Sequence, residues 1–338
     1  MTTLIFVVAF CIVGIFVYMA RYSGRLRVTQ TRIIDAPIDE VYRRVADFRH
    51  WGEWNPWLEH EPDAQTTLSR QSDREGSRYE WDSERLGVGF IEHVRLVARE
   101  RIEQKSRFKN PFRFRGRSRW QFIDRGGKTD VTWSMNGRVG FSLRAFAQTV
   151  QGTIALDYRY GLDRLARLVE PADAPRYSLA YPGVRDIPAG RYVYSTYKGA
   201  LKGLGAAMRK GFAELRQQLI DYGVQPSGEP IAVYVSTNIK LRTTVCHMGI
   251  LVGDAEVGQL PVRELPAHRA YVVRLQGSYA AMEVAWYQAM QRMRIENIQP
   301  DQRIPPFERY LNDPNTVIEN EYLTELHIPV RQAPLPLP

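Results

Sequence analysis

An internal repeat constrains the fold of the second half of this chain more than any other feature of its sequence. Residues 185–189 (RDIPA) match residues 263–267 (RELPA) at an offset of 78 positions. Self-similarity at a fixed offset is typical of a duplicated structural unit. After each copy, helical spacing is followed by strand-like sequence, at 201–222 and 230–235 in the first copy and at 279–296 and 307–310 in the second. We therefore predict a strand–helix–strand unit that occurs twice.

The length and composition of the chain predict two folded domains. Its 338 residues are enough for two domains of roughly 100 to 200 residues each. Hydrophobic residues make up 44% of the chain and charged residues 25%, which excludes collagenous and wholly disordered classes. Two cysteines, Cys11 and Cys246, exclude a disulfide framework and give no support to a zinc site. We expect neither a metal nor a cofactor.

Residues 1–24 are interpreted as a membrane anchor. The 17 residues of Leu4–Ala20 carry no charge, and as a helix they would span about 25 Å. No basic residue precedes the run, which argues against a cleaved signal peptide, and Phe10 before Cys11 argues against a lipoprotein site. A buried core helix is the remaining alternative. The basic residues follow the run, at Arg21, Arg25, Arg27 and Arg32. The positive-inside rule therefore predicts a membrane protein whose soluble domains are cytoplasmic.

The first domain, residues 27–170, is predicted to have an α+β fold. A strand at 28–35 precedes a short amphipathic helix that starts at Asp39. Five strand-like segments follow, at 78–83, 89–98, 101–108, 114–124 and 129–137. A helical stretch at 148–169 closes the domain. We expect an antiparallel sheet around this long C-terminal helix.

Four motifs of the first domain resemble a known family. They are IDAPIDEVY at 34–42, DF at 47–48, WGEWNPW at 51–57 and TDVTW at 129–133. Together they are similar to the polyketide cyclase/dehydrase branch of the START-like (SRPBCC) superfamily, over nearly all of residues 27–170. The resemblance implies a helix-grip fold with an apolar cavity, which in different members holds lipids, hormones or polyketides.

Aromatic residues of the first domain are candidate walls of that cavity, because they combine a large apolar area with a few polar tips. The candidate ligand-binding residues here are Trp54, Trp57, Trp81, Trp120 and Trp133. The alternative is that these side chains form an ordinary core. The histidines His50, His60 and His93 are scattered and indicate no catalytic triad.

Residues 105–119 (KSRFKNPFRFRGRSR) contain seven basic residues and no acidic one. The arginines that recur at period two, and so share one face of a strand, are Arg113, Arg115, Arg117 and Arg119. We predict that this face contacts anionic lipid headgroups; the alternative is a solvated outer face. Nucleic acid is disfavoured because no recognition helix or RNA-binding aromatic motif accompanies the charge.

The second domain, residues 180–331, resembles another family through its repeat and its closing motifs. These motifs are GEP at 228–230, GSY at 277–279, FERY at 307–310, NDP at 312–314 and LTELHIP at 323–329. They are similar to the GyrI-like family, the effector-binding domains of AraC- and MerR-type transcription activators. The resemblance implies two pseudo-symmetric halves and a groove for amphipathic, often cationic, aromatic compounds. This chain offers no helix-turn-helix, so we expect no direct DNA binding. Residues 171–179 are the expected linker and 332–338 a tail.

Glu308 is the main candidate site residue, because it stands where the GyrI-like family places its ligand-facing glutamate. A partly desolvated carboxylate attracts cations strongly and can move protons. The candidate walls, whose rings attract cations, are Tyr310, Tyr271, Tyr279 and Trp286. The alternative is a surface salt bridge of Glu308 with Arg303 or Arg309.

These features predict a membrane-tethered protein that senses, buffers or transfers a small amphipathic or hydrophobic ligand through two pocket domains. One alternative is an enzyme, a cyclase or hydrolase, in which Glu308 is the general base and Tyr310 or Tyr271 donates a proton. Another alternative is lipid handling at the membrane through the first cavity and the basic strand.

Overall fold

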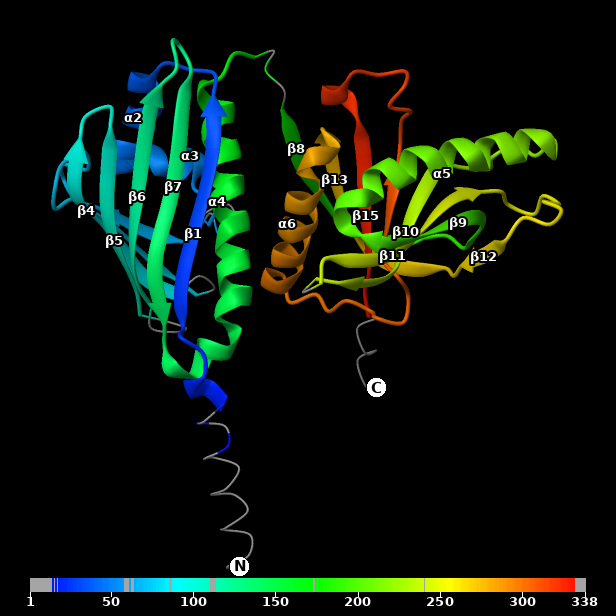
Figure 1. Cartoon of the computed structure of the whole chain (residues 1–338), viewed down its shortest axis with the longest axis horizontal. Coiled ribbons are helices and arrows are strands. Elements are labelled where there is room, and N and C mark those ends of the chain that lie inside the picture. The colour runs from blue at the N-terminus through cyan, green and yellow to red at the C-terminus, as the bar shows by residue number, and fades with distance from the viewer. Residues whose placement is uncertain are drawn as a thin grey trace, which may run out of the picture. The chain divides into compact units, whose positions relative to one another are not determined.

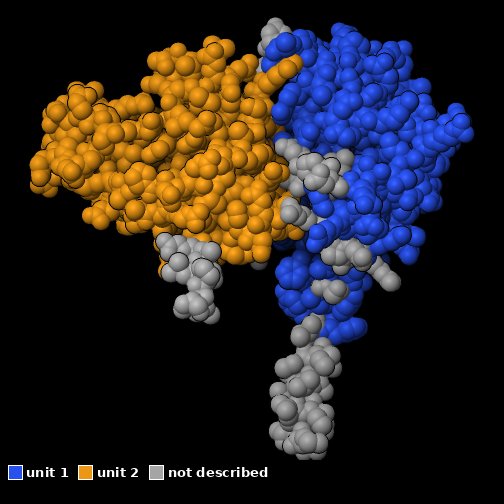
Figure 2. Space-filling model, turned by 180° about the vertical axis from the view of Figure 1, so that it is seen from behind, with its two compact units in different colours: residues 1–174 blue, residues 175–338 orange. Residues whose placement is uncertain are grey.

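The computed structural model describes residues 14, 16, 18–57, 61, 64–84, 87–109, 114–172, 174, 176–239 and 241–331. The chain divides into two compact units, residues 1–174 (unit 1) and 175–338 (unit 2), which are coloured separately in Figure 2. Most of the predicted anchor, Leu4–Ala20, lies outside the described residues. Within the described part of the chain, no helix combines the length and the apolar character needed to cross a membrane.

Unit 1 contains a seven-stranded antiparallel sheet with the strand order β1-β7-β6-β5-β4-β3-β2. The strands are β1 (Arg25–Ile34), β2 (Gln65–Leu68), β3 (Arg78–Ser83), β4 (Gly87–Val97), β5 (Arg101–Phe108), β6 (Phe114–Asp124) and β7 (Thr129–Val139). The short helices are α2 (Ile38–Ala46), η1 (Phe48–His50), α3 (Trp51–Trp54) and η3 (Phe141–Phe146). A helix of 23 residues, α4 (Ala147–Val169), follows β7 and η3 and runs along the sheet (Figure 1).

Alternating burial explains why these segments form a sheet with one covered face. Along β6, buried residues such as Phe114 and Trp120 alternate with exposed ones such as Arg115 and Arg117. The buried residues belong to one core cluster with the inner side of α4. The predicted α+β fold, with an antiparallel sheet and a long final helix, is confirmed. The sequence did not indicate β2, because its residues are all exposed and show no buried face.

Unit 2 is an eight-stranded antiparallel sheet with the strand order β12-β9-β11-β10-β14-β15-β13-β8. The strands are β8 (Tyr177–Ile187), β9 (Gly190–Ala200), β10 (Pro230–Asn238), β11 (Thr243–Leu251), β12 (Val262–Leu265), β13 (His268–Gly277), β14 (Phe307–Tyr310) and β15 (Leu323–Pro329). The helices are α5 (Leu201–Asp221), η4 (Tyr279–Ala281), α6 (Met282–Ile295) and η5 (Glu319–Glu321).

The repeat of the sequence appears as two copies of the same element order in unit 2. Each copy runs strand, strand, helix, strand, strand, from β8 to β11 around α5 and from β12 to β15 around α6. The first strand of each copy pairs with the second strand of the other copy, β8 with β13 and β12 with β9. The copies meet at the centre of the sheet, where β10 pairs with β14. This central pair carries the candidate site.

Candidate functional site

Glu308 lies on β14 at the junction of the two copies. Its backbone neighbours are Ala232 on β10 and Leu326 on β15. The residue is 1% exposed, although it stands in a four-residue strand whose buried positions otherwise carry aromatic rings. A carboxylate in this position has lost nearly all contact with water, so its stability depends on the groups around it.

Three neutral donors surround the Glu308 carboxylate. The Tyr234 hydroxyl (2.7 Å) and the Trp286 indole N–H (2.6 Å) both donate to Oε1, and the Tyr310 hydroxyl donates to Oε2 at 2.6 Å. These donors come from β10, α6 and β14, so both copies of the repeat contribute. Because an ionised carboxylate accepts about four hydrogen bonds, Oε2 keeps an unused lone pair.

No basic side chain of the described residues forms an ion pair with Glu308. Arg303 pairs instead with Asp301 at 2.6 Å, and Arg309 forms an ion pair with Glu229 at 3.7 Å. The alternative of a surface salt bridge is therefore excluded by the geometry. Burial raises the pKa of Glu308, and the hydrogen bonds from Tyr310, Trp286 and Tyr234 oppose that rise without cancelling it.

Aromatic rings form the second layer around the carboxylate. Trp286 and Tyr234 meet edge to face at 5.6 Å, and Tyr279 meets Tyr310 in the same way at 5.8 Å. Phe212 of α5 packs edge to face on Tyr310 at 5.7 Å. Most of these rings are partly accessible, whereas the carboxylate behind them is not. The carboxyl group of Glu308 is therefore surrounded by aromatic side chains.

The structure brings most of the predicted wall residues of unit 2 to Glu308, but not all of them. Trp286 and Tyr310 bond to the carboxylate, and Tyr279 contacts Tyr310. Tyr271 instead donates its hydroxyl to Glu296 at 3.1 Å, in the core beneath α6. Sequence reasoning missed Tyr234, Phe212 and Met208, whose Sδ lies 3.5 Å from the Tyr310 hydroxyl. Burial along β10 does not alternate, so only the register of β10 against β14 identifies Tyr234 as a neighbour of Glu308.

The predicted wall residues of unit 1 pack mainly on one another. Trp133 stacks on Trp120 at 4.1 Å and on Tyr158 of α4 at 3.5 Å, and Trp54 meets both indoles edge to face. These rings are almost fully buried, whereas Trp57 is partly exposed. Trp81 is buried beside Gly89, where an added Cβ would lie 2.4 Å from the indole. Trp54, Trp81, Trp120 and Trp133 belong to the core cluster of unit 1, and Trp57 packs against it.

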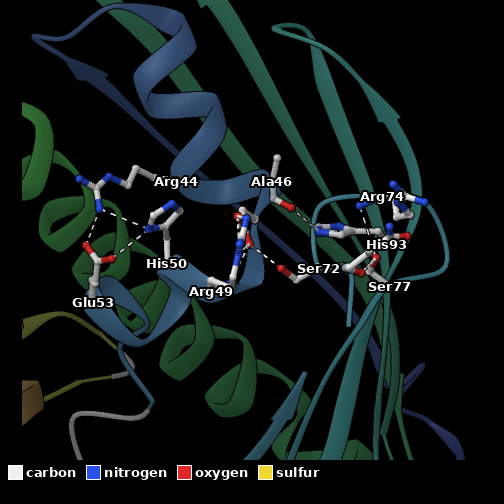
Figure 3. A network of polar contacts seen from close by, with 11 residues as sticks. Arg44, Ala46, Arg49, His50, Glu53, Ser72, Arg74, Ser77 and His93 are labelled. Atoms are coloured by element: carbon white, nitrogen blue, oxygen red, sulfur yellow. Dashed lines mark hydrogen bonds and ion pairs between the residues drawn. The ribbon is translucent and has the colours of Figure 1, made fainter. Parts of the chain in front are cut away.

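A polar network joins the short helices of unit 1 to its sheet (Figure 3). The Asp47 carboxylate accepts hydrogen bonds from Arg49 and from Ser72. Burial opposes ionisation of Asp47, but these hydrogen bonds outweigh it and hold the pKa well below its ordinary value. His93 is fully buried, and its Nε2 lies 2.8 Å from the carbonyl oxygen of Ala46. This contact makes Nε2 the donor, so the neutral imidazole is a structural bridge.

His93 should make unit 1 sensitive to mild acid. Burial lowers the pKa of His93 to about 4, whereas an unfolded histidine titrates near 6.5. At a pH between these two pKa values, His93 binds a proton in the unfolded chain but not in the folded chain. The free energy of unfolding should therefore fall by about 2 kcal/mol from pH 7 to pH 5. Urea unfolding followed by tryptophan emission measures this fall, and His93→Gln should remove most of it. An equal fall in the variant would contradict the assignment.

The predicted basic strand is β6, and its arginines differ in their surroundings. Arg115 and Arg117 are exposed, whereas Arg119 forms a salt bridge with Glu103 at 3.0 Å. Arg113 lies outside the described residues.

Two family models match the chain. Residues 25–170 match the family described as polyketide cyclase/dehydrase and lipid transport. Residues 208–331 match the family described as GyrI-like small molecule binding domain, a range that starts within α5. No curated protein is significantly similar to the chain.

Several solved structures are similar to one part of the chain each. Protein CV1439 from Chromobacterium violaceum is 20% identical, with 43% of this chain and 97% of that chain covered and a TM-score of 0.35. The EcmrR C-terminal domain is 17% identical, with 46% and 99% covered and a TM-score of 0.38. SAV2435, solved with tetraphenylphosphonium, is 14% identical, with 45% and 94% covered and a TM-score of 0.35. On the family matches, the chain joins a domain of the polyketide cyclase/dehydrase and lipid-transport family to a domain of the GyrI-like small-molecule-binding family.

Proposed function

We propose that unit 2 binds a small amphipathic cation, whose positive charge is placed against the Glu308 carboxylate. The observation that carries this proposal is a fully buried carboxylate whose three hydrogen-bond donors are all neutral. A buried charge is costly unless an opposite charge accompanies it. Glu308 has no ion-pair partner among the described residues, and a bound cation would supply the missing charge.

The aromatic surroundings specify the kind of cation. Tyr and Trp rings attract cations through their faces and also remove apolar surface from water. A small hydrated ion such as Na⁺ would use neither property. A cation whose charge is spread over an apolar body would use both, because its body can contact Tyr279, Phe212 and Trp286 while its charge faces Glu308.

The same geometry supports binding more than catalysis. A general base with a raised pKa is suited to proton transfer, and Glu308 has one. Tyr310, the candidate proton donor, is unsuited to release a proton, because burial and the adjacent Glu308 raise the pKa of Tyr310 well above the ordinary value. Tyr271, the other candidate acid, bonds to Glu296. We therefore rank ligand binding first and a cyclase or hydrolase activity second.

A pair of ions with the same shape and opposite charge tests the proposal. Tetraphenylphosphonium and tetraphenylborate each carry four phenyl rings around a charged centre. Isothermal calorimetry of the full chain should detect binding of the phosphonium and none of the borate, because the borate would place a second negative charge beside Glu308. Equal affinity for the two ions would show that binding depends on apolar contact alone, and it would overturn the proposal.

We also propose that residues 4–20 tether the chain to a membrane with both units on the cytoplasmic side. The uncharged run and the arginines that follow it support this topology. A reporter enzyme that works only in the cytoplasm should therefore be active when it is fused after Pro338, and one that works only in the periplasm should be inactive. Activity of a periplasmic reporter at the same position would reverse the orientation.

A further inference from the structure

The outer face of the unit 1 sheet carries arginines in adjacent positions of neighbouring strands. Strand register places Arg25 opposite Arg138, Arg138 opposite Arg115, and Arg115 opposite Arg107, in one row across β1, β7, β6 and β5. In the next row, Asn136 separates Arg27 from Arg117. We call these six side chains the arginine surface: Arg25, Arg27, Arg107, Arg115, Arg117 and Arg138. All six are exposed and lie on the face opposite to α4.

The arginine surface lacks the acidic partners that the rest of the same face has. Glu92 lies between Lys105 (2.5 Å) and Arg78 (2.7 Å), and Glu103 forms ion pairs with Arg119 (3.0 Å) and Arg101 (3.5 Å). Across the described residues, none of the six forms an ion pair. The basic excess of this face is therefore concentrated at one end, where β1 begins and β7 ends.

A row of like charges across a sheet requires an explanation. Neighbouring strands lie about 4.8 Å apart, so cross-strand arginines repel one another, and this repulsion destabilises the sheet. Anions that lie against the row would reduce the repulsion between its arginines. Because the row is spread over four strands, an extended array of negative charges would match it better than a single small anion.

Exposed aromatic residues occupy the same end of unit 1. They are Phe16, Tyr18, Tyr22, Phe141 and Phe146. The Val139 N–H bonds to the Gly24 carbonyl at 3.0 Å, which joins the start of β1 to the residues before η3, and Phe16 stacks on Phe141 at 4.8 Å. In Figure 1 this is the lower end of unit 1, below the labels of β1 and β7. Aromatic side chains beside basic ones are typical of surfaces at the boundary between water and lipid.

We propose that this end of unit 1 docks on an anionic lipid bilayer. The arginine surface contacts the headgroup phosphates, and the exposed aromatic rings enter the boundary between headgroups and acyl chains. A nucleic acid would also supply an array of phosphates. The position of the aromatic residues favours the membrane, because Tyr22, Phe141 and Phe146 lie outside residues 4–20 and flank the arginines at the end where β1 begins. The proposal is independent of the cation site and goes beyond the proposed tether by assigning a lipid class and a docking face.

A competition between two vesicle populations tests the proposal with the full chain. One population is phosphatidylcholine, and the other contains about one-third phosphatidylglycerol. Insertion of the uncharged run 4–20 does not distinguish them, so the ratio of bound chain reports the attraction of the basic residues to anionic lipid. At low salt the ratio should favour the anionic vesicles at least about tenfold. At roughly 1 M salt, where screening acts within about 3 Å, it should approach one.

Two variants with the same change in net charge complete the test. Arg25→Gln, Arg115→Gln, Arg117→Gln and Arg138→Gln together remove four unpaired arginines, and this variant should lose the preference for anionic vesicles. Arg78→Gln, Arg101→Gln, Arg119→Gln and Arg125→Gln together remove four arginines near acids, and this variant should keep it. Equal losses in the two variants would attribute the preference to net charge and overturn the proposal.

The unaltered chain provides the remaining decisive outcomes. Equal partition between the two vesicle populations at low salt would overturn the proposal even if a variant failed to fold. Duplex DNA that displaces the chain from anionic vesicles, with its binding lost in the first variant, would assign the surface to nucleic acid instead. Neither result bears on tetraphenylphosphonium binding at Glu308, and insertion into both vesicle populations alike would leave the tether intact.

Discussion

Replacing Glu308 with glutamine should weaken the binding of tetraphenylphosphonium by about 2 to 4 kcal/mol, roughly 30-fold to 1,000-fold. The substitution preserves size and removes the charge. The amide oxygen can still accept from Tyr234 and Trp286, and the amide N–H₂ can donate to the Tyr310 oxygen. The loss should therefore reflect the missing Coulomb attraction in a site from which water is excluded. Calorimetric titration of both proteins measures it.

The pH dependence of the same titration should have a defined sign. Cation binding requires the Glu308 carboxylate, whose pKa is raised by burial. Affinity should therefore rise with pH through that raised pKa, and this dependence should vanish in Glu308→Gln. In the absence of ligand, the raised pKa means that the folded chain holds the Glu308 proton more tightly than the unfolded chain. The contribution to stability is thus present below the ordinary pKa of glutamate and lost as the pH rises through the raised value.

Glu296→Gln is a matched control for Glu308→Gln. Glu296 also accepts a tyrosine hydroxyl, from Tyr271 at 3.1 Å, but a basic side chain, Arg292, lies 2.9 Å away. Its replacement should leave phosphonium affinity unchanged. Equal affinities in the parent chain and Glu308→Gln would show that Glu308 is not the charge that the ligand meets. Turnover of a substrate that disappears in Glu308→Gln, with binding retained, would instead favour the enzyme hypothesis.

The candidate site shows what a single sequence can and cannot predict. Glu308 and Tyr310 are neighbours in one strand, and a family resemblance identified them. Tyr234 is 74 positions away from Glu308 in the sequence. It reaches Glu308 only because β10 pairs with β14, with Ala232 opposite Glu308. Strand register of this kind depends on pairing between the two copies of the repeat, which the repeat itself does not specify.

The arginine surface illustrates the same limit in unit 1. Period-two spacing in β6 predicted that Arg115 and Arg117 share one face. Their neighbours Arg138 and Arg25 come from β7 and β1 and join the surface only through register. The spacing also grouped Arg119 with them, but Glu103 on β5 pairs with Arg119. Local periodicity places residues on a face, whereas cross-strand partners decide whether their charges are compensated.

Replacing Trp133 with alanine should destabilise unit 1 by about 3 to 5 kcal/mol, the usual cost of removing a fully buried tryptophan. The indole is 1% exposed and lies between Trp120 and Tyr158, so its removal leaves a cavity that neither ring can fill without losing its own contacts. Urea unfolding followed by tryptophan emission measures the effect. Six of the seven tryptophans belong to unit 1, and only Trp286 lies in unit 2.

Trp57→Ala is the comparison that separates a filled core from the wall of an occupied cavity. Trp57 is partly exposed, and its indole N–H donates to Asp157 at 3.1 Å. Its replacement should cost about 1 to 2 kcal/mol, because less apolar surface returns to water. If the two variants are equally destabilised by a small amount and an apolar molecule purifies with the parent chain but not with Trp133→Ala, then Trp133 lines a ligand cavity. A much larger loss of unfolding free energy in Trp133→Ala than in Trp57→Ala, with phosphonium binding unchanged, would indicate that unit 1 has a filled core. Unit 2 would then be the ligand-binding part of the chain.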